Sequence, residues 1–490
     1  MRIKWKRHFP LVLLLVVLLA SLALGLGSQR IVAYAPQAST DGKVPASQKN
    51  NKTVNNKIAL FDETQVHSLQ ILISDDDYQK MITTYQQTGL KDYFKADVVI
   101  DGVKVSSVGL RLKGNASLRT ALGGGRGGFG GFGGMPGGGN QPPPNGQDRP
   151  QRGGGPNQAP VAANPEASAG VKLPMLIKFD EYVASQNYQG YYFLSVRNYG
   201  TSYDAAMLQE PVTNSMFRLA GLPATHTAYA GVALNQNPEQ LYVLSEILDE
   251  TYLAEHYNDP KGILYKAEVG SSLTYVGNDP SSYRRSFSQE TRVKDADLGP
   301  LIAFARFLTE SDDATFAAEL PKRLDVDAFA TFLALNNLLV NNDSIVGMNN
   351  NYYLYYNEST KFFTMLFWDA NESLGKMGMG SQGATTDINI NLNQQGFRGP
   401  GGGSPNLLLK RFLSNPAFKA LYEEKVKLVY QKVYAGGAIS EQVNRYAALV
   451  HQALASRSLV DAASYDSAVE KVRTFITQRV AYLSATPLLK

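Results

Sequence analysis

The 490-residue chain contains no cysteine. This absence excludes disulfide bonds, thiolate metal sites, a cysteine nucleophile and a lipid-modified N-terminal cysteine. The net charge is small, at +4, and the cations are scattered along the chain, so there is no electrostatic reason to expect nucleic-acid binding. The content of 44% hydrophobic and 18% charged residues is ordinary for a globular protein with a sizeable core.

Histidine is scarce. The five histidines are His8, His67, His226, His256 and His451, and their spacing matches no metal-binding pattern. None of them lies near a serine in the context of a hydrolase nucleophile. His226 is beside the start of a predicted strand and is interpreted as a packing residue. The sequence therefore predicts neither a histidine metal site nor a serine hydrolase.

The N-terminus lacks acidic residues, because none precedes Asp41. A basic head at residues 2–7 is followed by an apolar run at 9–27 that is rich in Leu and Val. Cations on one side of an apolar segment of about membrane-spanning length are typical of export signals. We expect residues 1–35 to carry the protein out of the cytoplasm. They would act either as a cleaved signal peptide, leaving a secreted or cell-surface protein, or as a membrane anchor.

The remainder of the chain divides by composition. Residues 36–57 are polar and predict a flexible linker, after which an apolar pattern runs through 58–376. A stretch at 123–165, dominated by Gly and Pro, is predicted to be a disordered insert in this domain. A shorter Gly/Asn-rich loop at 377–405 precedes a helical part at 406–490, which we assign to the same domain.

The predicted elements mix strands and helices. The pair Asp101-Gly102 between alternating apolar residues indicates a hairpin at 98–105. Further strands are predicted at 108–113, 176–179, 229–234, 241–246, 352–356 and 362–367, and helices at 203–219, 249–256, 326–340 and from 407 onward. The fold class is therefore α+β.

The first candidate site surrounds the predicted hairpin at 352–367. Asp343, Asn350 and Asn351 precede the hairpin, and Asp369 follows it. Because a hairpin returns its ends to the same place, we expect these side chains to converge. Carboxylate and amide oxygens are hard ligands that suit Mg²⁺. The order of helix, acidic loop, hairpin and second aspartate is also that of a kinase catalytic centre.

The upstream half of the chain offers matching residues. Lys178, on a short predicted strand, could reach nucleotide phosphates, and Glu210, on the next helix, could hold it in an ion pair. Arg111 and Lys113 end an earlier strand and could also donate to phosphates. Pro211 is expected to bend the helix beside Glu210.

Five sequence blocks occur in the order seen in CotH proteins, which the chain resembles from about 58 to about 375. They are 108–117 (VGLRLKGNAS), 176–180 (LIKFD), 262–267 (GILYKA), 350–355 (NNYYLY) and 367–369 (FWD). The resemblance implies an atypical protein-kinase-like fold with two lobes, which uses ATP and Mg²⁺ to phosphorylate Ser or Thr of surface or coat proteins. By the same resemblance, Asp343 corresponds to the catalytic aspartate, Asp369 to a metal ligand, and Asn351 or Asn350 to the second metal ligand.

Two departures from the family pattern leave a second function open. Asn371 stands where relatives often carry a second acidic residue after the tryptophan, and Pro211 stands where they tend to carry a cation. The alternative to an active kinase is a catalytically inactive surface or coat scaffold that acts by binding proteins.

Overall fold

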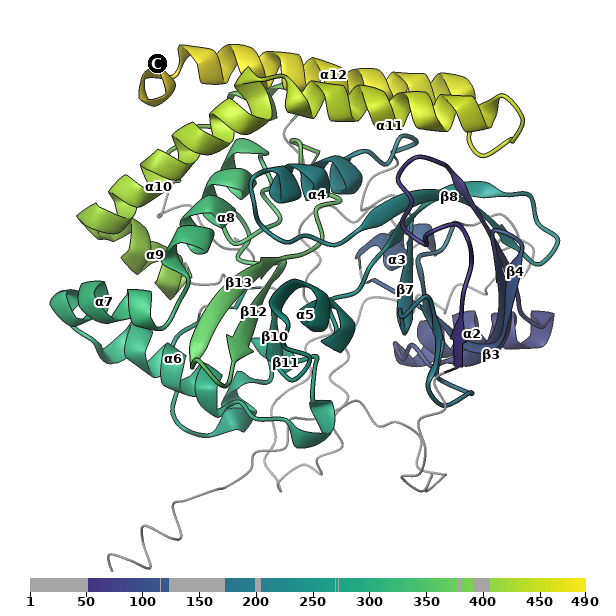
Figure 1. Cartoon of the computed structure of the whole chain (residues 1–490), viewed down its shortest axis with the longest axis horizontal. Helices are drawn as coiled ribbons and strands as arrows, with labels where there is room; N and C mark the ends of the chain where they lie inside the picture. Colours follow the sequence, from purple (N-terminus) through teal and green to yellow (C-terminus); the bar gives the residue numbers. More distant parts are fainter. Residues whose placement is uncertain are drawn as a thin grey trace, which may run out of the picture.

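The computed structural model describes residues 52–114, 116–122, 172–198, 204–268, 270–271, 273–376, 380–390 and 406–490. The predicted export segment at 1–35, the insert at 123–165, most of the linker and much of the 377–405 loop lie outside these residues. Among the described residues, none of the helices combines the length and apolar character that crossing a membrane requires. The described chain forms a strand barrel and, beside it, a part made of a sheet and helices (Figure 1).

Seven strands close into the barrel. In spatial order they are β2 (His67–Leu72), β3 (Phe94–Ile100), β4 (Val103–Leu112), β5 (Met175–Lys178), β7 (Phe193–Arg197), β9 (Gln240–Ser245) and β8 (Thr227–Leu234). Neighbours pair antiparallel, except that β2 and β8 pair in parallel and close the barrel. Alternate side chains such as Val98, Leu110 and Ile177 are fully buried in its core.

The turn between β3 and β4 forms where the sequence predicts it. Asp101 (φ 46°) and Gly102 (φ 81°) are both left-handed, as a two-residue turn of type I′ requires and as Asp-Gly readily allows. Helix α2 (Asp75–Thr88) packs against β3 and β4. It begins after Ser74, whose hydroxyl accepts a hydrogen bond from the backbone of Asp77.

The chain joins the folded unit before residue 58. Strand β1 (Lys52–Val54) pairs in parallel with β6 (Gln186–Tyr188). Asn56 Nδ2 donates to Ile100 O at 3.2 Å and to Tyr188 Oη at 3.0 Å. Residues 52–57, which the sequence places in the flexible linker 36–57, therefore belong to the folded part of the chain. Backbone and amide hydrogen bonds hold this segment in place although it has few apolar side chains.

The second part of the molecule surrounds a four-stranded sheet (Figure 1). Its order is β11 (Phe287–Gln289), β10 (Ile263–Ala267), β12 (Tyr352–Asn357) and β13 (Phe362–Phe367), with helices α5 (Glu250–Tyr257), α6 (Gly299–Glu310), α7 (Asp313–Glu319) and α8 (Val326–Leu338) around it. The predicted 352–367 hairpin is β12 with β13, and the predicted 326–340 helix is α8. This part has its own large apolar core, so the described chain has two lobes.

Helix α4 (Gln209–Leu219) links the two lobes through contacts with β8 and α8. The sequence predicts a start at 203, whereas the helix begins at 209. Pro211 therefore lies in the first turn, where its missing N–H costs no helical hydrogen bond. Because a proline in the first turn does not bend a helix, the bend predicted beside Glu210 is not expected here.

The C-terminal helices extend over both lobes. They are α9 (Leu407–Ser414), α10 (Pro416–Val429) with the π-helical turn Tyr430–Ala435, α11 (Ala438–Leu454) and α12 (Ala462–Ala485). Helix α10 packs on α8, and α11 and α12 run side by side toward β8 (Figure 1). Between them, Arg457 donates to Val66 O at 2.9 Å and pairs with Glu239 at 2.9 Å. The C-terminal helices thus belong to the same folded unit as the barrel.

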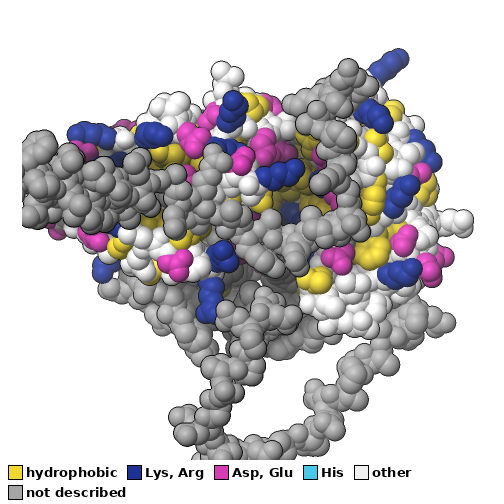
Figure 2. All heavy atoms as spheres, turned by 90° about the horizontal axis from the view of Figure 1, so that it is seen from below, with side chains coloured by type: hydrophobic (Ala, Val, Ile, Leu, Met, Phe, Trp, Pro, Cys, Tyr) yellow, Lys and Arg dark blue, Asp and Glu magenta, His cyan; other side chains and the backbone are white. Residues whose placement is uncertain are grey.

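The face seen in Figure 2 carries both signs of charge. Lys and Arg side chains lie among Asp, Glu and apolar side chains on the part that the described residues form. The described surface visible there therefore has no extended basic patch of the kind that follows a nucleic-acid backbone.

Candidate functional site

The loop between α8 and β12 carries the acidic residue of the predicted site, Asp343. Its backbone is tightly wound: Val340 has a φ of 49°, which is rare for a β-branched residue, and Met348 N donates to Asn342 O at 2.9 Å. A Cβ on Gly347 would lie 2.0 Å from Asn342 O, so this turn requires glycine. Strained backbone held by surrounding structure is frequent at functional sites.

The C-terminal helices hold the start of this loop. Tyr434 Oη donates to Leu338 O at 2.9 Å, and Arg479 Nε donates to the same oxygen at 3.0 Å. Arg479 also donates to Asn337 O at 3.3 Å and to Ala384 O at 3.1 Å. Its fully buried guanidinium therefore satisfies carbonyls that the last turn of a helix leaves without intrahelical partners.

Asp343 receives hydrogen bonds from both predicted asparagines. Asn350 Nδ2 donates to Asp343 Oδ1 at 3.1 Å, and Asn351 Nδ2 donates to Asp343 Oδ2 and to its backbone oxygen, both at 2.9 Å. Burial raises the pKa of Asp343 to about 7, and the negative charges of Asp369 and Glu372 also raise it. The hydrogen bonds from the two amides oppose this shift. The structure thus brings the four predicted residues together and adds Glu372.

Arg197 connects the two other acidic residues of the site. Its Nε lies 2.5 Å from Glu210 Oε2, and a second guanidinium nitrogen pairs with Asp369 Oδ1. Burial by itself would lower the pKa of Arg197, but the two carboxylates outweigh burial and raise it. Ser245 Oγ donates to the other oxygen of Glu210 at 3.3 Å. The guanidinium therefore joins the end of β7 to α4 and to Asp369, which lies two residues after the end of β13. Asp369 itself has a left-handed backbone, with a φ of 56°.

Lys113 lies beside the same group of charges. Its Nζ is 4.9 Å from the centre of the Trp368 ring, and the Arg197 guanidinium is 5.8 Å from that centre. Burial, and after it the charge of Arg197, lowers the pKa of Lys113 to about 7 against the opposing charges of Asp369 and Glu210. Of the cations predicted to face phosphates, Lys113 is the one that the structure brings to the carboxylates.

Lys178 does not form the expected ion pair with Glu210. Its Nζ lies 2.7 Å from Glu181 Oε2 and 5.7 Å from the centre of the Tyr93 ring. Arg111 lies over the same ring at 5.2 Å. Strands β4 and β5 therefore place both side chains on the Tyr93 side of the barrel, which corrects the predicted role of Lys178 as the partner of Glu210.

Sequence reasoning missed two residues of the site. Arg197 ends the short apolar strand β7 shortly before α4, and this is the same signal that singled out Lys178 at the end of β5. Glu372 follows Asp369 closely after an apolar strand, and its side chain is 2% exposed. Neither signal distinguishes a buried charge from a charge at the surface.

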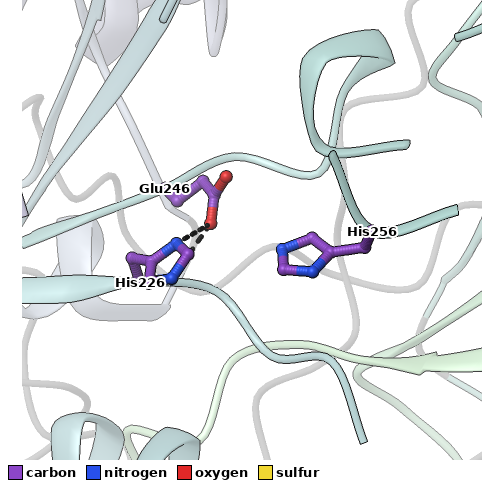
Figure 3. Close-up of side chains that lie close together, drawn as sticks. All are labelled: His226, Glu246 and His256. Carbon is purple, nitrogen blue, oxygen red and sulfur yellow. Dashed lines mark hydrogen bonds and ion pairs between the residues drawn. The ribbon is translucent and has the colours of Figure 1, made fainter. Parts of the chain in front are cut away.

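A second cluster consists of His226, Glu246 and His256 (Figure 3). His226 directly precedes β8, Glu246 directly follows β9, and His256 lies in the last turn of α5. One ligand atom from each lies within 4.8 Å of the others, and His226 Nδ1 is 3.1 Å from Glu246 Oε2. His226 does pack, because its ring stacks on Phe61 with centroids 6.2 Å apart, and it also hydrogen-bonds Glu246. The fold joins three residues whose spacing in the sequence carries no metal-binding pattern.

A family model described as CotH kinase protein matches residues 172–483, which is well over half of the chain. The chain belongs to the CotH family. The resemblance found in the sequence is thus confirmed, although its first block, at 108–117, precedes the matched region.

Two known proteins are similar to parts of this CotH chain. The inner spore coat protein H of Bacillus subtilis (strain 168) is 23% identical over 235 residues, which is 47% of this chain and 60% of the relative. The aligned region therefore spans less than two thirds of the relative. The crystal structure of a Helicobacter pylori proinflammatory kinase, CtkA, matches 59% of this chain and 88% of its own at 11% identity, with a TM-score of 0.28.

Proposed function

We propose that this CotH protein is a protein kinase that transfers the γ-phosphoryl group of ATP to Ser or Thr hydroxyls of coat or surface proteins. The observation that carries the proposal is the environment of Asp343, whose carboxylate is oriented by two amides and lies within the field of two further carboxylates. Such a cluster has the composition of a kinase catalytic centre.

The acidic residues fit a divalent cation. Asp343 is buried, and the negative charges of Asp369 and Glu372 add to burial in raising its pKa, so its ionised form is disfavoured. A hard cation held by Asp369 and by an asparagine oxygen would relieve that repulsion. Either Asn351 or Asn350 would supply that oxygen, because each amide nitrogen donates to the Asp343 carboxylate and leaves the amide oxygen pointing elsewhere.

The roles of the chain's own groups follow from their chemistry. Bound ATP with Mg²⁺ would supply the phosphoryl group and the charge neutralisation that its transfer needs. Asp343 would orient the acceptor hydroxyl and accept its proton, for which a pKa of about 7 is well matched to neutral pH. Lys113 would contact phosphate oxygens, with Arg197 holding Glu210 and Asp369 beside it.

The place of action is inferred from the relative and from the N-terminus. A similar protein is named as an inner spore coat protein, which supports a coat or surface protein as the substrate. The basic and apolar residues at 1–35 support export, with the domain anchored to the membrane or released to the cell surface.

The test is nucleotide binding by calorimetry and transfer of labelled γ-phosphate to a generic protein acceptor, with the full chain. Asp369→Asn should weaken Mg²⁺-dependent nucleotide binding, because the cation loses an anionic ligand. Asp343→Asn should leave nucleotide binding nearly intact and abolish transfer. Asp295→Asn is the matched control, since Asp295 is exposed at the surface.

The second candidate is a catalytically inactive scaffold. It is favoured by the ion pair that Arg197 already makes with Asp369 and by Asn371 in place of a second acidic residue. Absence of nucleotide binding by the wild-type protein at any Mg²⁺ concentration would favour this alternative over the kinase.

A further inference from the structure

We propose that His226, Glu246 and His256 bind a transition-metal ion of the Zn²⁺ class, at a site separate from the kinase centre. Figure 3 shows the three side chains facing a common space, with Glu246 bonded to His226 and the His256 ring directed toward them from α5. The inference is independent of whether the protein transfers phosphate.

Backbone and side-chain bonds hold two of the three residues in place. Glu246 N donates to His226 O at 3.0 Å, and His226 N donates to Glu246 Oε2 at 3.0 Å. These reciprocal bonds fix the start of β8 against the end of β9. Two ligands of the site are therefore prearranged by the barrel, and the third comes from the helix that follows it.

Two polar atoms of the cluster lack partners. Glu246 is 1% exposed, and its Oε1, like Nε2 of His256, is buried without a hydrogen-bond partner among the described residues. Buried polar atoms without partners are costly and uncommon in native proteins. Ring stacking between His226 and His256, with centroids 6.0 Å apart, packs the rings but satisfies neither atom. A cation between the side chains would satisfy both.

The chemistry of the ligands selects the ion. Two imidazoles and one carboxylate are the ligands of many Zn²⁺ sites, whereas Mg²⁺ and Ca²⁺ prefer oxygen ligands alone. The three ligand atoms lie within 4.8 Å of one another. Tetrahedral coordination with metal–ligand bonds of about 2 Å places ligand atoms about 3.3 Å apart, so each side chain must move inward by about 1 Å when the ion binds. Both histidines are partly exposed, which gives an ion access and a water the fourth position.

The surrounding charges do not oppose a cation. Arg218 acts on His226 with positive charge, but its guanidinium is already paired with Glu63 at 2.6 Å. Glu255 acts on the same ring with negative charge. An ion here would hold β8, β9 and α5 together where the two lobes connect. The site adjoins Ser245, whose hydroxyl donates a hydrogen bond to Glu210.

The experiment is calorimetric titration of the chelator-treated full chain with ZnCl₂, together with melting curves with and without Zn²⁺. We expect one Zn²⁺ per chain and a rise in Tm that Mg²⁺ does not reproduce. His256→Ala should weaken binding by more than the roughly 10–100-fold that loss of a supporting contact costs. His451→Ala is the matched control, because His451 is half-exposed and pairs with Asp466 on α12.

Two further measurements keep the outcome decisive. If His256→Ala does not fold, His256→Gln and the visible spectrum of the wild-type Co²⁺ complex report on the same ligands, since tetrahedral nitrogen and oxygen coordination gives an intense Co²⁺ band. Asp369→Asn should bind Zn²⁺ like the wild type. Absence of stoichiometric Zn²⁺ binding, or equal loss in His451→Ala and His256→Ala, would overturn the proposal.

Discussion

Arg197 at the end of β7 and Glu210 in the first turn of α4 form a buried ion pair, with Nε and Oε2 2.5 Å apart. Glu210 is 5% and Arg197 is 9% exposed. Because the same guanidinium also contacts Asp369, one cation sets the distance between the barrel, the helix linking the lobes and the end of the β12–β13 hairpin. Arg197 is therefore the cation that positions Glu210 and Asp369 relative to each other.

Replacing Arg197 with Met should therefore be strongly destabilising. Loss of one partner of a buried pair leaves the Glu210 carboxylate uncompensated, which costs about 3–5 kcal/mol of the free energy of unfolding. Lys178→Met should cost at most about 1 kcal/mol, because its pair with Glu181 is partly exposed. Urea unfolding of both variants measures the difference. Equal stability of the two variants would contradict the assignment of Arg197.

Arg479 gives a second prediction, on the support of the loop that carries Asp343. Arg479→Met should lower the free energy of unfolding by roughly 2–4 kcal/mol, because buried carbonyls at the end of α8 and at Ala384 lose their donor. The loop start should also loosen and phosphate transfer should slow. Arg473→Met, on the exposed side of the same helix, is the control and should have little effect. Wild-type stability and transfer in Arg479→Met would show that α12 does not position the loop.

The sequence predicts those parts of the site that neighbouring elements bring together. The hairpin at 352–367 follows from alternation around a polar turn, and with it comes the approach of Asp369 to Asp343. The Asp101-Gly102 turn likewise follows from local backbone preferences. Both predictions need only short-range geometry, which side-chain periodicity and turn residues encode directly.

The sequence does not predict which cation reaches Glu210. Lys178 and Arg197 each end a short apolar strand, and the choice between them depends on how the strands β5 and β7 are placed in a closed barrel. The cluster of His226, Glu246 and His256 is hidden for the same reason, because only the pairing of β8 with β9 and the docking of α5 join its members. The pairing of strands that are distant in the chain leaves no periodic pattern of residues in the sequence.

The export prediction concerns residues outside the described part of the chain. Leu14→Arg with Val17→Arg should retain the protein in the cytoplasm, because each charge at the centre of an apolar segment costs about 2.5–3.5 kcal/mol on insertion. Ala46→Arg, in the linker, is the control and should be exported like the wild type. Protease treatment of intact cells and fractionation measure the location. Full-length wild-type protein with an intact N-terminus in the cytosol would contradict the prediction.

The pKa of Asp343 leads to a prediction on the pH dependence of stability. Burial raises this pKa from 3.8 to about 7, so between these values the folded protein holds a proton that the unfolded chain has released. The contribution of this group to the free energy of unfolding is therefore fully present below about pH 4 and is lost as the pH rises toward 7. The free energy falls by at most about 1.4 kcal/mol for each pH unit. Asp343→Asn removes this dependence. Asp249, whose pKa burial also raises to about 7, contributes equally to both proteins and cancels in the comparison.

Activity should change with pH in the opposite direction to stability. Asp343 must be ionised to accept the proton of the acceptor hydroxyl, so phosphate transfer should rise as the pH passes through about 7. A nearby cation favours the ionised carboxylate, so raising the Mg²⁺ concentration should move this rise to lower pH. The measurements are urea unfolding of the wild type and Asp343→Asn from pH 4.5 to 8, and the pH profile of transfer at two Mg²⁺ concentrations. If the stability difference between wild type and Asp343→Asn is the same at every pH, Asp343 has an ordinary pKa. A transfer rate that does not respond to pH near 7 would then remove Asp343 as the base.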